Sequence, residues 1–88
     1  MKIEILGDDC GKCRKLYDNV RQAAVEAGAA VEVIRTNDPD TLARYGILAL
    51  PGLVVDGTLE SSGKVLSVAE VRRLIAREAL GLKLPGTH

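Results

Sequence analysis

The spacing of apolar side chains changes along the first third of the chain. Residues 2–6 alternate between polar and branched apolar side chains, which is typical of a strand. From Cys10 to Ala27 the apolar positions recur every three or four residues, which indicates an amphipathic helix. Residues 30–35 are rich in valine and isoleucine and predict a second strand. A strand, a helix and a strand in this order predict a βαβ unit with parallel strands and a right-handed crossover.

The second half of the chain predicts a short helix, a hairpin and a final helix. An Asp-Pro pair at positions 38–39 is typical of an N-cap followed by the first helical residue. Residues 52–55 predict a strand, and the Asp-Gly pair at 56–57 predicts a tight turn into an edge strand. The Ser-Val-Ala-Glu sequence at 67–70 is a capping box that begins the last helix. The predicted order is therefore β-α-β-α-β-β-α.

Length and composition limit the classes of function. The chain has 88 residues, which is the size of one domain. We expect a domain over residues 1–81 and a C-terminal tail over residues 82–88. Zero net charge and only two aromatic residues, both tyrosines, argue against binding to nucleic acid. The sequence has neither the pattern of a signal peptide nor an apolar run of about 18 residues. We therefore expect a protein of the cytoplasm with no membrane segment. We also expect it to be a monomer.

The most informative local pattern is a pair of cysteines, Cys10 and Cys13, at the junction between the first strand and the first helix. A helix N-terminus stabilises an anion, and the thiolate is the nucleophilic form of cysteine. Lys12 adds a positive charge, and Gly11 removes bulk beside the first sulfur. Cys13 begins the apolar stripe of the helix and should be covered. We expect Cys10 to attack a disulfide and Cys13 to resolve the mixed disulfide.

Two other uses of the cysteine pair remain open at this point. A structural zinc site needs four ligands, but the chain has no second cysteine pair and its single histidine is His88. Two thiolates alone can bind Cu(I), so a soft-metal carrier is one alternative. Copper carriers of this size end in a strand, however, whereas this pattern ends in a capped helix. The other alternative is a non-catalytic interaction module with an inert pair.

Several short segments within about residues 1–80 form a combined pattern. These segments are Lys2-Ile3-Glu4-Ile5-Leu6-Gly7, Cys10 with Cys13, Asn19-Val20, Tyr45-Gly46-Ile47, Pro51 and Leu53-Val54-Val55-Asp56-Gly57. The pattern resembles the thioredoxin superfamily, and within it the small redox-active disulfide proteins, which are short, glutaredoxin-sized thioredoxins. The resemblance implies a thioredoxin-like α/β fold with a four-stranded mixed sheet and helices on both faces.

The resemblance also implies properties of the site. It implies a cis peptide bond before Pro51, beside the cysteines, and a partner peptide bound through main-chain atoms of Leu50. A trans proline that only begins the strand is the alternative from sequence. Glu4 matches the position of a thioredoxin acid that helps to deprotonate the resolving cysteine, although we expect Glu4 to face solvent. The chain departs from thioredoxin at Asp9 and Lys12, where thioredoxin has Trp and Pro, and many relatives have Thr in place of Leu50.

The implied reaction needs a partner and a source of electrons. A disulfide-containing protein is the expected substrate, because residues 61–64 read Ser-Ser-Gly-Lys where glutaredoxins have a Gly-Gly that binds glutathione. The redox centre would be the Cys10–Cys13 disulfide itself, with no bound cofactor. The resemblance implies that a thioredoxin reductase restores the dithiol with electrons from NADPH.

Overall fold

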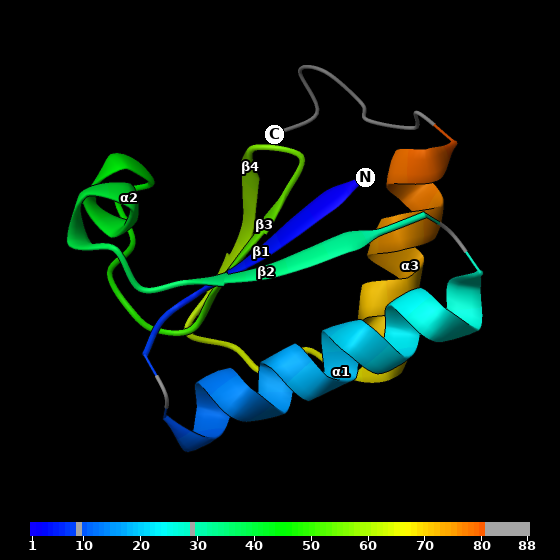
Figure 1. Cartoon of the computed structure of the whole chain (residues 1–88), viewed down its shortest axis with the longest axis horizontal. Helices are drawn as coiled ribbons and strands as arrows, with labels where there is room; N and C mark the ends of the chain where they lie inside the picture. Colours follow the sequence, from blue (N-terminus) through cyan, green and yellow to red (C-terminus); the bar gives the residue numbers. More distant parts are fainter. Residues whose placement is uncertain (9, 29, 81–88) are drawn as a thin grey trace.

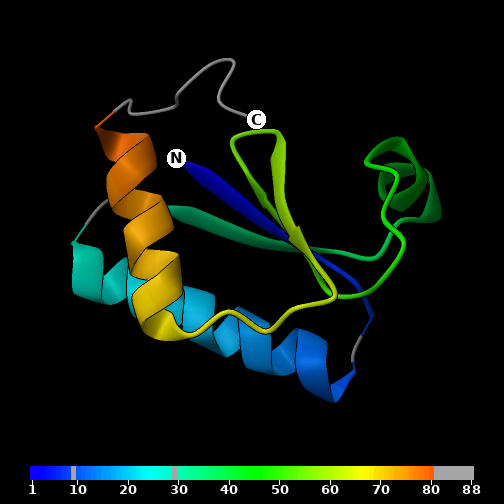
Figure 2. The same cartoon turned by 180° about the vertical axis from the view of Figure 1, so that it is seen from behind.

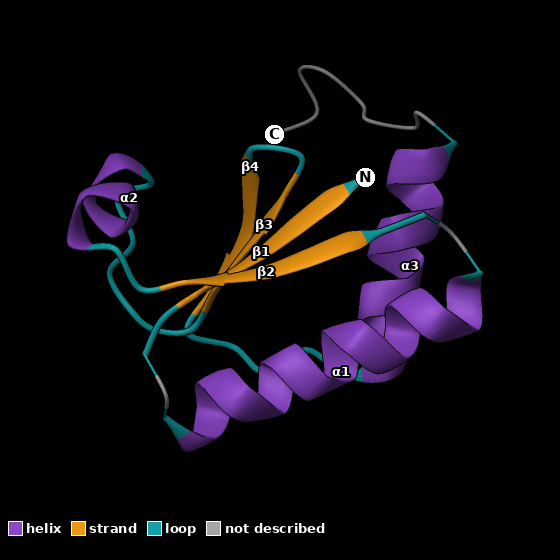
Figure 3. Cartoon of the chain, in the orientation of Figure 1, coloured by secondary structure: helices purple, strands orange, loops and turns teal. Residues whose placement is uncertain are grey.

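The computed structural model describes residues 1–8, 10–28 and 30–80, so Gly81 and the tail expected at 82–88 lie outside the described residues. Within these ranges, no helix combines the length and the apolar composition needed to cross a membrane. The predicted order of elements is confirmed (Figures 1 and 3). The elements are β1 (Lys2–Leu6), α1 (Gly11–Ala27), β2 (Glu32–Thr36), α2 (Pro39–Arg44), β3 (Gly52–Val55), β4 (Thr58–Ser62) and α3 (Val68–Ala79).

The strands form one mixed sheet of four strands in the order β2-β1-β3-β4. β1 lies in the middle, where it pairs in parallel with β2 and antiparallel with β3. β4 pairs antiparallel with β3 at the edge. The turn between them is formed by Asp56 and Gly57, whose φ angles are 47° and 84°. Positive φ at both positions is what a two-residue type I′ hairpin turn requires, and the predicted hairpin is confirmed.

α1 and α3 pack against each other and together cover one face of the sheet (Figures 1 and 2). α2 lies apart from them on the other side, beyond the ends of β1 and β2, and has no fully buried residue. The core therefore fills the space between the sheet and the α1–α3 pair. Its buried side chains are Ile3, Ile5, Leu53 and Val55 of the sheet, Leu16, Val20 and Ala23 of α1, and Val71 and Ile75 of α3.

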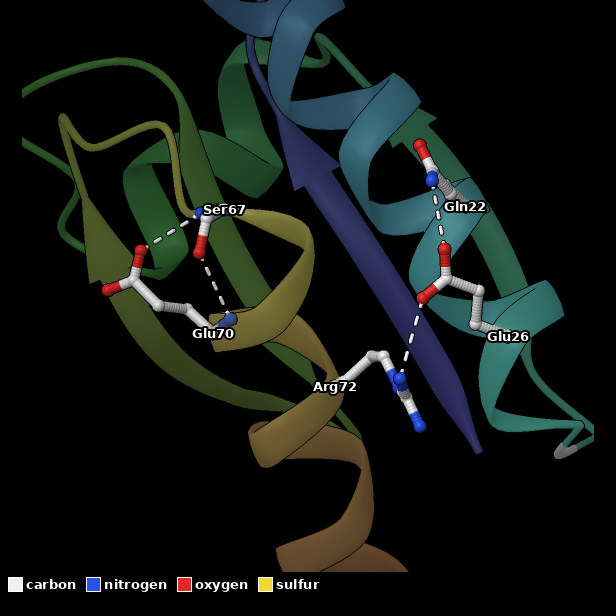
Figure 4. Close-up of polar contacts among 5 residues, drawn as sticks. All are labelled: Gln22, Glu26, Ser67, Glu70 and Arg72. Carbon is white, nitrogen blue, oxygen red and sulfur yellow. Dashed lines mark hydrogen bonds and ion pairs between the residues drawn. The ribbon is translucent and has the colours of Figure 1, made fainter.

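Polar contacts define how α3 begins and where it touches α1 (Figure 4). The N–H of Glu70 donates to the Ser67 hydroxyl at 3.1 Å, and the N–H of Ser67 donates to the Glu70 carboxylate at 2.9 Å. The predicted capping box is thus complete. Between the helices, Arg72 donates to Glu26 at 3.5 Å, and Gln22 donates to the other Glu26 oxygen at 2.8 Å. Exposed ion pairs contribute little to stability, so apolar burial determines how α3 packs on α1.

Candidate active site

The two cysteines lie where the chain passes from β1 into α1. Cys10 is the N-cap of α1, and its sulfur accepts a hydrogen bond from the N–H of Cys13 at 3.1 Å. The two residues form a disulfide, and their Cα atoms are 5.2 Å apart. The first N–H groups of a helix have no acceptor within the helix. The Cys10 sulfur therefore takes the place that a serine or aspartate oxygen takes at most helix N-termini.

The two cysteines differ in their exposure to solvent. Cys10 is exposed, whereas Cys13 is only 1% exposed and begins the buried stripe of α1 that continues with Leu16 and Val20. The apolar spacing in the sequence predicted this covering of Cys13. Gly11 and Lys12, between the cysteines, are both exposed. A partner can therefore reach the first sulfur directly, while the second lies against the body of the protein.

Gly7 belongs to the site, although the sequence pattern did not predict its role. Its N–H donates to the carbonyl of Thr36 at 2.9 Å, which extends the pairing of β1 with β2 by one residue. A Cβ atom on Gly7, which has a φ of +154°, would lie 2.7 Å from the Cys13 sulfur. Carbon and sulfur repel each other at that distance, so the missing side chain makes room for the buried sulfur. The only sign in the sequence is a glycine at the end of the strand.

The loop that precedes β3 reaches the same place. The peptide bond between Leu50 and Pro51 is cis. Pro51 is buried, and Leu50 is 37% exposed. A Cβ on Gly7 would lie 3.8 Å from the Cβ of Leu50, so the glycine that contacts Cys13 also adjoins this loop. The structure therefore brings residues 50–51 beside the cysteine pair, although about forty residues separate them in sequence.

Two hydrogen bonds from the end of β4 hold this loop in position. The Ser62 hydroxyl donates to the carbonyl of Ala49 at 2.9 Å, and the N–H of Gly63 donates to the carbonyl of Pro51 at 2.8 Å. A Cβ on Gly63 would lie 2.9 Å from the Ala49 Cβ, so the loop is also packed closely there. Within the described part of the chain, no hydrogen bond engages the main chain of Leu50. Its N–H and carbonyl therefore have no hydrogen-bonding partner among the described residues.

Glu4 lies in the middle of β1, opposite Val54 on β3 and Ile34 on β2. Because side chains alternate along a strand, Glu4 is on the face opposite to Ile3 and Ile5, away from the core under α1 and α3. The residue is half-buried, so it does not face solvent as fully as we expected. Among the described residues, no hydrogen bond or ion pair joins Glu4 to Gly7, the cysteines or Leu50.

The described residues do not bring together three or more His, Cys, Asp and Glu side chains that could hold a metal ion. The cysteine pair supplies two soft ligands at most, and here the sulfurs are bonded to each other. A sulfur in a disulfide is not a thiolate ligand. In this state the pair can accept two electrons and open to a dithiol.

Comparison with known proteins identifies relatives over nearly the whole chain. A family model described as a thioredoxin domain matches residues 1–76. Thioredoxin of Methanothermobacter thermautotrophicus is 38% identical over 76 residues, which cover 86% of this chain and 99% of that protein. Thioredoxin of Methanocaldococcus jannaschii is 33% identical over 70 residues, 80% of each chain.

Solved structures show the same architecture. Chloroplastic thioredoxin z aligns with a TM-score of 0.74 at 21% identity, over 91% of this chain and 79% of that one. Thioredoxin 1 of Thermosipho africanus aligns with a TM-score of 0.66 at 22% identity, over 94% of this chain and 100% of that one. At these identities the likeness concerns the fold, and the predicted thioredoxin-like α/β fold is confirmed.

Proposed function

We propose, from the premise that this chain belongs to the thioredoxin family and is a thiol–disulfide oxidoreductase, that Cys10 is its attacking residue and Cys13 its resolving residue. The observation that carries this assignment is the difference in exposure, since Cys10 is exposed at the helix N-cap and Cys13 is 1% exposed. Exchange requires a thiolate that a partner sulfur can reach. A partner sulfur can reach the sulfur of Cys10 in the folded protein. The buried sulfur of Cys13 can react only with the neighbouring sulfur of Cys10.

The reaction runs in two exchanges. The Cys10 thiolate attacks one sulfur of the partner disulfide, so a mixed disulfide forms while the partner S–S bond breaks and a partner thiolate leaves. The Cys13 thiolate then attacks the Cys10 sulfur and releases the second partner thiolate. Both leaving thiolates take up protons from water. Two electrons pass to the partner, and the protein ends with the Cys10–Cys13 disulfide.

Helix α1 supports the first exchange through its N-terminus. The N–H of Cys13 already donates to the Cys10 sulfur at 3.1 Å, and this bond is stronger when the sulfur is an anion. The helix dipole places partial positive charge at the same end. Lys12 adds a full positive charge inside the motif, and Gly11 leaves the approach to the sulfur open. These features favour the thiolate of Cys10, and the carboxylates of Asp8 and Asp9, which precede it in the sequence, oppose it.

Leu50 and Pro51 bind the partner in this proposal. The main-chain N–H and carbonyl of Leu50, which have no partner among the described residues, pair with an extended segment of the substrate as a short added strand. The hydrogen bonds from Ser62 and Gly63 keep this edge in place. The substrate is a protein that carries a disulfide, and its cysteine would lie over the exposed sulfur of Cys10.

The cycle requires an external reductant, because each turnover leaves the cysteine pair oxidised. We propose a thioredoxin reductase that draws electrons from NADPH, as is expected for a chain whose curated relatives are thioredoxins. We further propose that the protein works as a monomer in the cytoplasm, where thiols are kept reduced. Glu4 is not assigned a step, since no hydrogen bond or ion pair among the described residues joins it to the cysteines or the Leu50 loop.

The role assignment is tested by trapping. The Cys13→Ser variant, mixed with insulin as the disulfide substrate, should accumulate a covalent adduct through Cys10. Dithiothreitol should reduce this mixed disulfide and separate the two proteins. The Cys10→Ser variant is the matched control and should form no adduct. An adduct with Cys10→Ser and none with Cys13→Ser would reverse the roles.

The electron source is tested with the wild-type chain. NADPH oxidation should depend on this protein, on a thioredoxin reductase and on insulin together. Absence of turnover with reductases from several archaea and bacteria would overturn the proposed reductant, while leaving the trapping result valid.

A further inference from the structure

Leu48 is the most exposed large apolar side chain in the part of the chain that the structure describes, at 98%. It lies two residues before Leu50, so their Cα atoms are at most about 7 Å apart along the chain. Leu50 in turn adjoins Gly7, which contacts the Cys13 sulfur. Leu48 is therefore at the rim of the redox site, unlike Val25, which is 81% exposed near the far end of α1.

The chain on both sides of Leu48 is anchored. The preceding residue, Ile47, packs directly against the backbone of Gly52, where a Cβ would overlap the Ile47 side chain. The following residue, Ala49, has its carbonyl held by the Ser62 hydroxyl at 2.9 Å. Leu48 is thus held in solvent by two fixed neighbours. The main chain that carries Leu48 is therefore preorganised for contact, because it has little backbone freedom left to lose on binding.

Single exposed leucines are common on protein surfaces and need no explanation by themselves. The position of this one differs, because disulfide exchange brings a partner over the rim whenever Cys10 reacts. A protein partner whose main chain pairs with Leu50 would place its own side chains along residues 48–50. A contact that covers Leu48 would remove its exposed apolar surface from water, which favours binding.

We propose that Leu48 determines specificity by packing against an apolar side chain that flanks the reacting cysteine of a disulfide-bearing protein substrate. This inference rests on the proposed function and adds the chemical class of sequence that the site prefers. Leu48 acts on the binding of the substrate and takes no part in the transfer of electrons. Replacement of Leu48 should therefore raise the substrate concentration at half-saturation and leave the limiting rate unchanged.

The test uses two synthetic disulfide-linked peptide dimers, one with leucine and one with serine on either side of the cysteine. The protein is first reduced with dithiothreitol and freed of it, so that no reductase takes part. Wild type should half-saturate at about tenfold lower concentration of the leucine peptide than of the serine peptide. Leu48→Ser should lose this preference, and Leu48→Met should keep most of it. Val25→Ser is the matched control and should behave as wild type.

A small aromatic disulfide, dithiobis(nitrobenzoate), measures the chemistry of the cysteines without a peptide contact. Its rate should be the same in wild type and Leu48→Ser. The proposal is overturned if Leu48→Ser keeps the preference for the leucine peptide, if Val25→Ser loses it equally, or if the small disulfide slows to the same extent. If wild-type dithiol reduces the small disulfide but neither peptide nor insulin, the proposed function itself fails, and this outcome is distinct from the others.

Discussion

The N-termini of α1 and α3 are constructed differently. α3 begins with the serine hydroxyl of Ser67 and has Glu70 in its first turn, with both hydrogen bonds of the capping box present. α1 begins with the sulfur of Cys10 and has no acidic residue in its first turn. Lys12 stands there instead. Negative charge stabilises a helix N-terminus and positive charge does not, so only α3 follows the rule for stability.

This difference separates a helix start that serves stability, in α3, from one that serves the proposed chemistry, in α1. In α3 the N–H of Glu70 is satisfied by the Ser67 hydroxyl, and the helix contributes its buried face to the core. In α1 the same kind of groups face a sulfur, which is a weak acceptor as a thiol and a strong one as a thiolate. In the proposed function, the start of α1 is therefore weakly capped while Cys10 is a thiol, and it stabilises the thiolate of Cys10. The following substitutions test this contrast.

Replacement of Cys10 by serine should have the largest effect. Activity in disulfide reduction should fall by roughly a thousandfold or more, because the nucleophile is lost. The free energy of unfolding should nevertheless rise by up to about 1 kcal/mol relative to reduced wild type, because serine is a preferred N-cap. Urea unfolding of both proteins in excess reductant measures this. A less stable Cys10→Ser variant would mean that the sulfur is already a good cap and would remove the contrast with α3.

Replacement of Gly7 by alanine should destabilise the protein by about 1–3 kcal/mol, because the new methyl group collides with the covered sulfur. The collision is expected from the 2.7 Å between the added Cβ and the sulfur of Cys13. Gly11→Ala is the matched control, since a Cβ there meets nothing within 4 Å. Urea unfolding of the two variants compares them. Equal stability would show that the site around Cys13 can relax.

Replacement of Ser67 by alanine should lower the free energy of unfolding by about 1 kcal/mol through loss of the cap. The rate of exchange with insulin should stay at the wild-type value, because Ser67 belongs to α3 and not to the site. Ser67→Asp should restore the stability. A loss of exchange rate in Ser67→Ala, without any loss of stability, would contradict the separation between the two helix starts.

The smallest effect concerns pH. The N–H of Ser67, which donates to the carboxylate, holds the pKa of Glu70 below its ordinary value, and the Ser67 side chain adds to this. A carboxyl with a lowered pKa in the folded state contributes stability above its unfolded pKa and loses it as the pH falls through its folded pKa. Glu70→Gln should therefore be less stable than wild type near neutral pH, and the difference should shrink in acid. Urea unfolding across this range measures it, and a constant difference would contradict the pKa shift.

Local sequence was sufficient for most of the fold and for the centre of the site. The change of apolar period at Cys10, the Asp-Gly turn and the capping box each depend on neighbours within a few residues. Each formed where it was expected. The covering of Cys13 also followed from helical periodicity alone. These features need no knowledge of strand order, because a turn, a cap or a helical stripe is defined by the chain itself.

The contacts that support the site were not predictable in this way. Gly7 against Cys13 and the Ser62 hydroxyl on Ala49 join different elements, so they depend on strand order and on the path of a loop. The packing of the Tyr17 ring against Arg35, 4.9 Å from guanidinium carbon to ring centre, also joins two elements. No periodicity encodes which residues meet across such distances. Hydrophobic periodicity indicates which face of a helix or strand a residue occupies. It does not indicate which residue of another element packs against it.

Residues 47–50 illustrate this boundary most clearly. In the sequence they are four consecutive apolar residues before Pro51, and their pattern does not indicate which of them are exposed. In the structure Ile47 packs on Gly52, whereas Leu48 is 98% exposed. The chain's own pattern established the elements, the caps and the place of the cysteine pair, because these arise from interactions among near neighbours. Only the folded arrangement decided which of residues 47–50 packs against the sheet and which stays exposed, because their exposure depends on elements far apart in the chain.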